Sequence, residues 1–449
     1  MLATVLYFLL TLAILIAVHE FGHFWVARKL GVKVLTFSIG FGRALWQRVD
    51  ASGTRYVLAA IPLGGYVRML DEREDKVPPD VAHQAFNRQP IWSRALIILA
   101  GPMANFLLAV LVYWIVFVAG VPGLKPAIGD TLVNSPAQRA GLFAGQEIVA
   151  VDGRVVRSRS EVNMALLRRV GDSGEIVIDA RFNSSDVADQ YRIPVQRWLA
   201  GEELQPPQRA LGIVYWEPDW PAVVDQVQPG EPAAMAGLQS GDLILAIDGE
   251  TISNWQDAVD AISARPGATI MLALRRAAGT LEKPVTLASH EREDGKRIGR
   301  IGISVQVPEM PAHMQVTLRY GWLNALARAV SETVEMVAFT LESIKKMLVG
   351  LVSTDNLSGP VTIAKIAGAS ASSGLVSYLQ FLALISISLG VINLLPIPVL
   401  DGGQLALLGV EAVSGRPLPE RMLLWFQQTG MLVIIGIMVL ALYNDFSRL

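Results

Sequence analysis

Four long runs of apolar residues, separated by polar stretches, dominate the pattern of the chain. They cover residues 1–18, 95–122, 374–400 and 422–443, and none of them contains a charged side chain. A helix needs about 20 predominantly apolar residues to cross a bilayer. Each run therefore predicts a transmembrane helix, and the first helix continues through a polar motif to Ala27.

The first run also has the position of a secretory signal peptide. Signal peptides carry a basic segment before the apolar run and a small-residue cleavage site after it. This run is flanked by neither, so we expect a retained helix. The chain has 449 residues, 52% of them hydrophobic, and a mean hydropathy of +0.41. That composition is typical of a membrane protein rather than a soluble one.

Basic residues predict the orientation of the helices. Residues 28–94, between the first two runs, contain eleven Lys and Arg against six Asp and Glu. Loops rich in Lys and Arg stay in the cytoplasm. With four crossings, both termini and the long stretch between the second and third runs then lie outside. We expect a membrane protein with both termini on the outer side of the membrane.

The long outer stretch contains an internal repeat. "SPAQRAGLFAGQEIVAVDG" begins at Ser135, and "EPAAMAGLQSGDLILAIDG" begins at Glu231, 96 positions later. Each copy reads as a short helix, a strand and an Asp-Gly turn, followed by a second helix and another strand. A period of this length predicts two similar small domains rather than a solenoid. The pattern resembles the PDZ domains of bacterial envelope proteases, which can bind an extended peptide in a groove. The alternative is that these domains are rigid spacers or a size filter over the membrane part.

Two further segments flank these domains. Residues 29–93 are rich in strand formers and contain Gly40, Gly42, Gly64 and Gly65, which predicts β-hairpins. An open sheet edge cannot face lipid, so this sheet either lines a cavity or pairs with another strand. A small cytoplasmic sheet without a catalytic role is the alternative. Residues 309–373 contain an amphipathic helix that either lies on the membrane or packs against the outer domains.

The resulting organisation has ten parts. They are a first helix (1–28), a β-rich segment (29–93), a second helix (94–122), two PDZ-like domains (125–215 and 216–308), an amphipathic segment (309–373), a third helix (374–400), a cytoplasmic loop (401–421), a fourth helix (422–443) and a periplasmic C-terminus (444–449).

The first helix contains a motif of ionisable residues that can bind a metal ion. His19 and His23 are four residues apart, so on a helix both imidazoles reach the same ion. Glu20 lies beside them, which gives the H-E-x-x-H pattern of zinc metalloproteases. Zn²⁺ with three protein ligands and an open position activates water and polarises a carbonyl, and Glu20 would accept the proton of that water. Ionisable groups inside an apolar helix are costly, and metal binding would offset that cost.

A third ligand is expected at the end of the third run. Asp401 lies in "NLLPIPVLDGGQ", where Pro396 and Pro398 break the helix. The predicted orientation brings both Asp401 and the histidine motif near the cytoplasmic face. A solvent-exposed turn residue is the alternative for Asp401.

Three motifs together resemble the site-2 protease family of intramembrane zinc metalloproteases. They are "HEFGH" in the first helix, "GPMANF" from Gly101 and "NLLPIPVLDGG" from Asn393. The resemblance implies a multi-pass α-helical membrane protein with four transmembrane helices, a membrane-reentrant β-hairpin region and two periplasmic α+β PDZ domains. It places the protein in the bacterial inner membrane, with both termini in the periplasm. It also implies that His19, His23 and Asp401 bind zinc, that Glu20 is the catalytic base and that Asn393 holds the substrate or stabilises the oxyanion. Asn105 would support the site from the second helix.

The resemblance further implies the substrates. These would be transmembrane segments of membrane proteins that another protease has already trimmed, such as an anti-sigma factor, and residual signal peptides. The hairpin would take the substrate as an added strand. The residue after "LDGG" is Gln404, where many members of the family have His, so no role follows for that side chain.

Other function classes fit the sequence less well. The chain has no Cys, which excludes disulfides and thiolate chemistry, and a net charge of −2 argues against nucleic acid as a partner. A membrane-anchored PDZ scaffold with a structural metal site would have no use for Glu20. A metal transporter would need ionisable groups on several helices, and the second and fourth runs have none.

Overall fold

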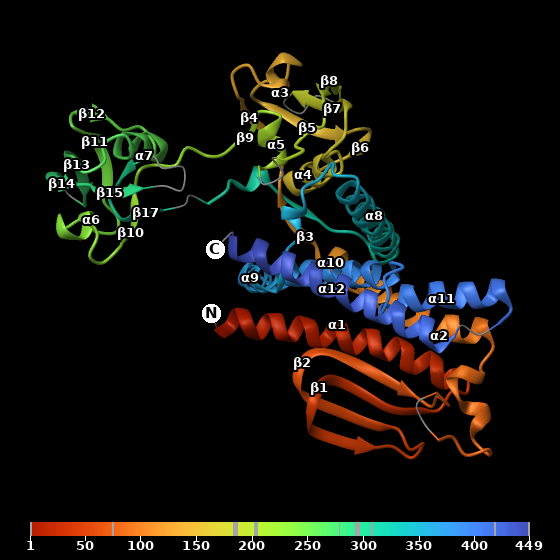
Figure 1. Cartoon of the computed structure of the whole chain (residues 1–449). Coiled ribbons are helices and arrows are strands. Elements are labelled where there is room, and N and C mark those ends of the chain that lie inside the picture. Colours follow the sequence, from red (N-terminus) through yellow and green to blue (C-terminus); the bar gives the residue numbers. More distant parts are fainter. Residues whose placement is uncertain are drawn as a thin grey trace.

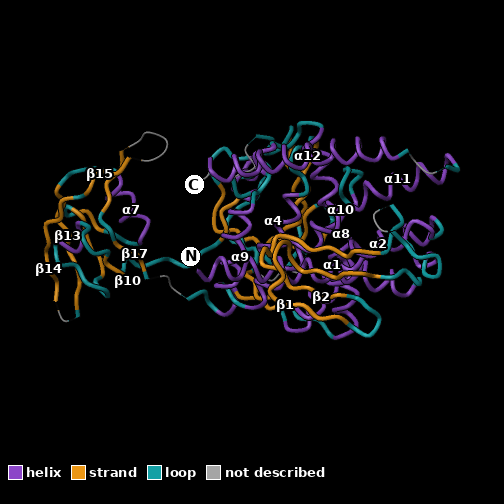
Figure 2. The backbone as a smooth tube through the Cα atoms, turned by 60° about the horizontal axis from the view of Figure 1, so that its bottom comes forward, coloured by secondary structure: helices purple, strands orange, loops and turns teal. Residues whose placement is uncertain are grey.

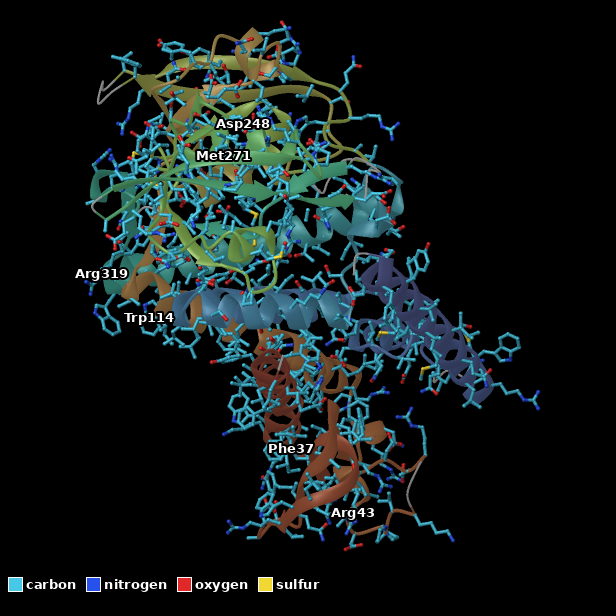
Figure 3. The ribbon with its side chains drawn as sticks, turned by 90° about the vertical axis from the view of Figure 1, so that its left-hand side faces the viewer. Phe37, Arg43, Trp114, Asp248, Met271 and Arg319 are labelled. Carbon is cyan, nitrogen blue, oxygen red and sulfur yellow. The ribbon has the colours of Figure 1, made fainter. Side chains whose placement is uncertain are left out.

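The computed structural model describes residues 2–73, 76–182, 187–201, 205–277, 279–291, 297–306, 309–416 and 419–447. Long helices form the middle of the molecule, a β-sheet covers one side, and two small α+β domains lie on the other (Figure 1). Figure 3 shows this order along the molecule, with Phe37 and Arg43 of the sheet at one end and Asp248 and Met271 of the second small domain at the other. Trp114 lies between them at the end of the helical layer.

Four helices in the described part of the chain are long and apolar enough to cross a membrane, so the prediction of four apolar helices is confirmed. They are α1 (Leu2–Lys29), α2 (Ile91–Ala119), α10 (Leu375–Leu394) and α12 (Glu420–Ser447). Small residues let these helices approach closely. Gly22 of α1 lies against Ala100 and Ala104 of α2, and Gly390 of α10 lies against the Phe106 ring.

Several predicted boundaries differ from the structure. The third helix ends at Leu394 because Pro396 and Pro398 cannot continue it, and residues 395–400 form a turn. Residues 401–421, which we expected as a loop, contain the helix α11 (Asp401–Ser414), and Gly415 ends it in the left-handed conformation. Helix α12 continues to Ser447, and the last two residues of the predicted C-terminal segment lie outside the described residues.

The predicted hairpin segment forms one sheet from β1 (Val34–Val49) and β2 (Arg55–Met69). Both strands bend, so that residues 36–39 pair with residues 65–68 on one side and with residues 55–58 on the other. Positive φ angles at Gly40 (93°) and Gly64 (145°) lie at these bends. Several large apolar side chains of this sheet are exposed, namely Phe41, Leu45, Trp46, Val49, Leu58 and Ile61.

The two repeats form small domains with the same strand order. Four strands lie in the order β6-β5-β7-β8 in the first domain and β12-β11-β13-β14 in the second. The repeated Asp-Gly turns have positive φ at both residues, and Asp152 and Asp248 each accept a hydrogen bond from the amide of the neighbouring strand, at Val177 and Met271. This turn matches the twist of a hairpin, so each repeat folds alike.

The elements of the first domain are β4 (Ile128–Thr131), α3 (Pro136–Arg139), β5 (Gln146–Val151), β6 (Arg154–Val155), α4 (Arg159–Leu167), β7 (Gly174–Phe182), β8 (Asp189–Val195), α5 (Pro207–Ala210) and β9 (Ile213–Tyr215). Those of the second are β10 (Val224–Val227), α6 (Pro232–Met235), β11 (Leu243–Ile247), β12 (Glu250–Thr251), α7 (Trp255–Ser263), β13 (Thr269–Arg276), β14 (Gly279–Thr286), β15 (Ala288–Glu291), β16 (Arg297–Arg300) and β17 (Ile303–Val305). Figures 1 and 2 both show the second domain standing apart from the helices, whereas the first lies beside α8.

The segment after the second domain returns to the helices. Strand β18 (Gln315–Leu318) pairs with β3 (Val121–Leu124), and helices α8 (Trp322–Leu348) and α9 (Pro360–Ser372) follow. The amphipathic α8 uses its charged face to contact the first domain, where Glu335 pairs with Arg154 (2.8 Å) and Arg168 (3.0 Å). Part of its apolar face, including Val334, is exposed.

Candidate metal centre

Helix α1 brings two imidazoles together. His19 and His23 are each 9% exposed, and their Nε2 atoms lie 3.2 Å apart. This proximity follows from their i, i+4 spacing on one helical face. Since both Nε2 atoms point to the same place, the pair presents two nitrogen ligands to a common ion.

Asp401 completes the group from a different part of the chain. Its Oδ2 lies 3.2 Å from His19 Nε2 and 3.5 Å from His23 Nε2. The three ligand atoms all lie within 4.8 Å of one another, and they form the one such group of His, Cys, Asp or Glu residues among the described positions. The sequence-predicted ligands are therefore neighbours in space although more than 370 positions separate Asp401 from the histidines in the sequence.

The turn before Asp401 determines where this carboxylate lies. Asp401 is the first residue of α11, and Val399 has a φ of 80°, which β-branched residues rarely adopt. A Cβ on Gly402 would overlap the carbonyls of residues 394 and 395, and one on Gly403 would overlap the Ile397 carbonyl. The two glycines thus let α11 begin directly against the preceding turn.

Helix α2 forms the wall behind the histidines. Gly101 faces them, and a Cβ there would overlap His23 Nε2 and lie 2.8 Å from His19 Cε1. The outer nitrogen of His23, Nδ1, lies 2.8 Å from the Ile97 carbonyl oxygen. The outer nitrogen of His19, Nδ1, lies 3.3 Å from Nδ2 of Asn105, which is fully buried. Sequence reasoning identified Asn105 but missed Ile97 and the role of Gly101.

These residues fit a zinc ion. Two imidazole nitrogens and one carboxylate oxygen are the donor set of many catalytic zinc sites, which keep a fourth position open. Oδ2 of Asp401 is buried and has no hydrogen-bond partner in the described structure, although it faces both histidines. A buried carboxylate oxygen without a partner is costly, and a bound cation would stabilise it.

The two other predicted site residues, Glu20 and Asn393, lie outside the group of three ligand atoms. Glu20 follows His19 on α1, and Gly65 of β2 packs against it, because a Cβ on Gly65 would lie 2.9 Å from Glu20 Cγ. The sheet therefore contacts the acid of the motif. Asn393 lies in the last turn of α10 and is partly buried, but in the described structure it makes no hydrogen bond to either histidine or to Asp401.

Comparison with known proteins identifies the family. The family model described as "Peptidase family M50" matches residues 7–437. The chain belongs to peptidase family M50. It is 43% identical to the "Regulator of sigma-E protease RseP" of Escherichia coli K12 and 42% identical to a "Putative zinc metalloprotease" of Vibrio cholerae, with 98% of both chains covered in each case.

Membership of family M50 confirms the predicted class of enzyme. The chain is a metalloprotease, its cofactor is zinc, and its four apolar helices are those of a membrane-embedded peptidase. Among solved structures, the PDZ domain of an SdrC-like protein from Listeria innocua matches at 27% identity with a TM-score of 0.18, covering 20% of this chain and 97% of that domain.

Proposed function

We propose that His19, His23 and Asp401 bind Zn²⁺ and that the enzyme hydrolyses peptide bonds at the depth of this site within the membrane. The single observation that carries this proposal is the meeting of the three ligand atoms within 4.8 Å. Zn²⁺ supplies a Lewis acid that polarises the scissile carbonyl and makes water a nucleophile near neutral pH. Glu20, one residue from His19, accepts a proton from the attacking water and passes it to the leaving amine.

The β1–β2 sheet is proposed to present the substrate. A transmembrane helix must unwind before one of its peptide bonds can be attacked, and a strand edge replaces some of the lost hydrogen bonds. The contact between Gly65 and Glu20 supports this role, since it holds β2 beside the general base. The exposed apolar side chains of the sheet support its reentry into the membrane. Asn393 is proposed to hold the unwound substrate or to stabilise its oxyanion.

The two small domains are proposed to be periplasmic PDZ domains. Their common strand order and their repeated Asp-Gly hairpins support a shared fold. The basic segment 28–94 supports an orientation in which the sheet lies on the cytoplasmic side of the membrane and both termini and both small domains lie outside. In this position the domains admit substrates whose outer parts have already been removed.

The substrates are proposed to be transmembrane segments of pre-trimmed membrane proteins. A relative that is 43% identical over 98% of the chain is named a regulator of sigma-E protease, which supports an anti-sigma factor as one substrate. Residual signal peptides form the second proposed class.

A cleavage assay tests this function. The purified chain in detergent is mixed with a transmembrane model substrate, beside the Glu20→Gln and Glu250→Gln variants. Glu20→Gln is expected to bind zinc normally and to lower the cleavage rate by about 100-fold or more, which is the usual contribution of general acid–base catalysis. Glu250 lies in the second small domain and serves as the matched control. Cleavage by Glu20→Gln at the unaltered rate would refute the proposed base.

A further inference from the structure

The outer nitrogen of His23 has a partner that fixes the ring. Its Nδ1 lies 2.8 Å from the Ile97 carbonyl oxygen. A carbonyl oxygen can only accept a hydrogen bond, so Nδ1 must carry the hydrogen. In the neutral ring, Nε2 then has a free lone pair that points into the metal centre. Helix α2 thus holds His23 in the tautomer that can bind a cation through Nε2.

The outer nitrogen of His19 faces a side chain instead. Asn105 is fully buried on α2, and its Nδ2 lies 3.3 Å from His19 Nδ1. Nδ2 is a donor, and donation to Nδ1 would leave the hydrogen of the neutral ring on Nε2, where it would block metal binding. The Oδ1 of Asn105 is meanwhile buried and has no hydrogen-bond partner.

We propose that Asn105 is a positioning residue for His19 and that its Oδ1 accepts a hydrogen bond from His19 Nδ1–H when the metal is bound. The two ends of a primary amide are nearly isosteric, so a half-turn of the side chain places Oδ1 toward the ring without moving the backbone. This inference rests on the metal ligands proposed above.

The arrangement of α2 supports this assignment. The acceptors at residues 97 and 105 are eight positions apart and so lie on one face of the helix, with Gly101 midway between them. Ser386 of α10 donates a hydrogen bond to the main-chain carbonyl of Asn105 (2.8 Å), which holds this turn of α2 in place. Both histidines then donate to acceptors on one helix, in the way that zinc-binding histidines usually donate to an outer carbonyl or carboxylate.

Zinc affinity provides the test, because it does not depend on catalysis. The dissociation constant of Zn²⁺ is measured by chelator competition on the full-length chain. Asn105→Leu removes the acceptor and is expected to weaken binding by about 10- to 100-fold, the usual effect of losing an outer partner. Asn105→Asp keeps an acceptor and is expected to bind within about threefold of the unaltered chain or more tightly. Thr11→Val, which removes a buried hydroxyl bonded to Tyr378 elsewhere on α1, is the control and is expected to change nothing.

The outcomes separate this inference from the proposed function. Unaltered affinity in Asn105→Leu would overturn it, and so would a loss in Asn105→Asp as large as that in Asn105→Leu. If Asn105→Leu does not fold, Asn105→Asp decides alone, since a donor role for Asn105 predicts weaker binding in that variant. If the unaltered chain does not bind zinc, or if His19→Ala does not abolish its zinc binding, the proposed metal site itself fails. This inference then fails with it.

Discussion

At the scale of single residues, Gly101 is the point at which α2 meets both histidines. A Cβ at this position would overlap His23 Nε2 and press on His19. Moving α1 away from α2 to make room would break the close contact of Gly22 with Ala100 and Ala104. We therefore predict that Gly101→Ala weakens zinc binding by at least about tenfold, by displacing ligands without removing one.

A matched glycine provides the control for this prediction. Gly409 lies inside α11, and a Cβ there would meet no atom within 4 Å. Gly409→Ala should leave zinc affinity unchanged and raise the free energy of unfolding by about 1 kcal/mol, since Ala is the better helix former. Equal zinc affinities in Gly101→Ala and the unaltered chain would show that Gly101 does not constrain the ligands.

Local patterns predicted the proposed ligands but not their surroundings. The i, i+4 spacing of His19 and His23 is a property of a single helix, so the sequence alone reveals it. Asp401 was found because prolines and glycines mark an unusual turn at the end of an apolar run. The contacts of the Ile97 carbonyl and of Gly101 with the histidines depend on where α2 passes α1. Every residue has a main-chain carbonyl, so the sequence does not indicate which one accepts the hydrogen bond.

At the scale of elements, α11 carries Asp401 and is joined to α2 by an ion pair. Arg94, near the start of α2, donates two hydrogen bonds to Glu411 (2.6 and 3.1 Å) and is only 8% exposed. Removing one member of a buried pair leaves an uncompensated charge, whereas replacing both is often neutral. We predict that Glu411→Met costs at least about 2 kcal/mol in unfolding free energy and that adding Arg94→Met recovers most of it.

The measurement is a double-mutant cycle in detergent micelles. The exposed pair of Arg88 and Glu72 (2.7 Å) provides the comparison, and its coupling energy should stay below about 1 kcal/mol. Additive effects of Glu411→Met and Arg94→Met would show that the pair does not fix α11 to α2.

Helix α11 is also the element that the sequence pattern missed. The segment between the third and fourth apolar runs was interpreted as a loop, although seven of the eleven residues from Gln404 to Ser414 are apolar. Gly415 was an available signal, because glycine commonly follows the last residue of a helix. The four long apolar helices were predicted because their composition alone requires them, whatever their neighbours are.

At the scale of the whole molecule, the two repeats differ in the side chain at a buried polar position. Asp242 in the second domain is fully buried and pairs with Arg276 (2.6 Å), whereas the corresponding Gln146 in the first domain bonds to Tyr191. The hydrogen bonds from Arg276 lower the pKa of Asp242 below its usual value. A carboxyl group with a lowered pKa in the folded state stabilises that state above the pKa of the unfolded chain, which is about 4.

The second domain should therefore lose stability as the pH falls below about 4, and the first domain should lack this contribution. Hydrogen-exchange protection of each domain in the full-length chain, followed from pH 6 to pH 3, measures the difference. Asp242→Asn should lower protection of the second domain at pH 6 and flatten its dependence on pH. The same slope in both domains, or in the variant and the unaltered chain, would contradict this account.

The arrangement of the domains was predicted only in outline. A repeat with a period of 96 residues indicated two similar domains, since each copy contains its own turns and strands. The amphipathic helix was expected either to lie on the membrane or to pack against the outer domains, and in the structure the charged face of α8 contacts the first domain through Glu335. Amphipathic spacing gives the two faces of a helix, and only the fold decides which neighbour each face contacts.

The central claim is that one cation is bound jointly by α1 and the start of α11. X-ray absorption at the zinc edge of the purified Glu20→Gln protein tests it most directly, because that variant keeps every proposed ligand. We predict two imidazole nitrogens at about 2.0–2.1 Å and a carboxylate oxygen at about 2.0–2.2 Å from a single zinc ion, with the signal lost in His23→Ala and in Asp401→Ala. A zinc spectrum that neither substitution changes would contradict the account.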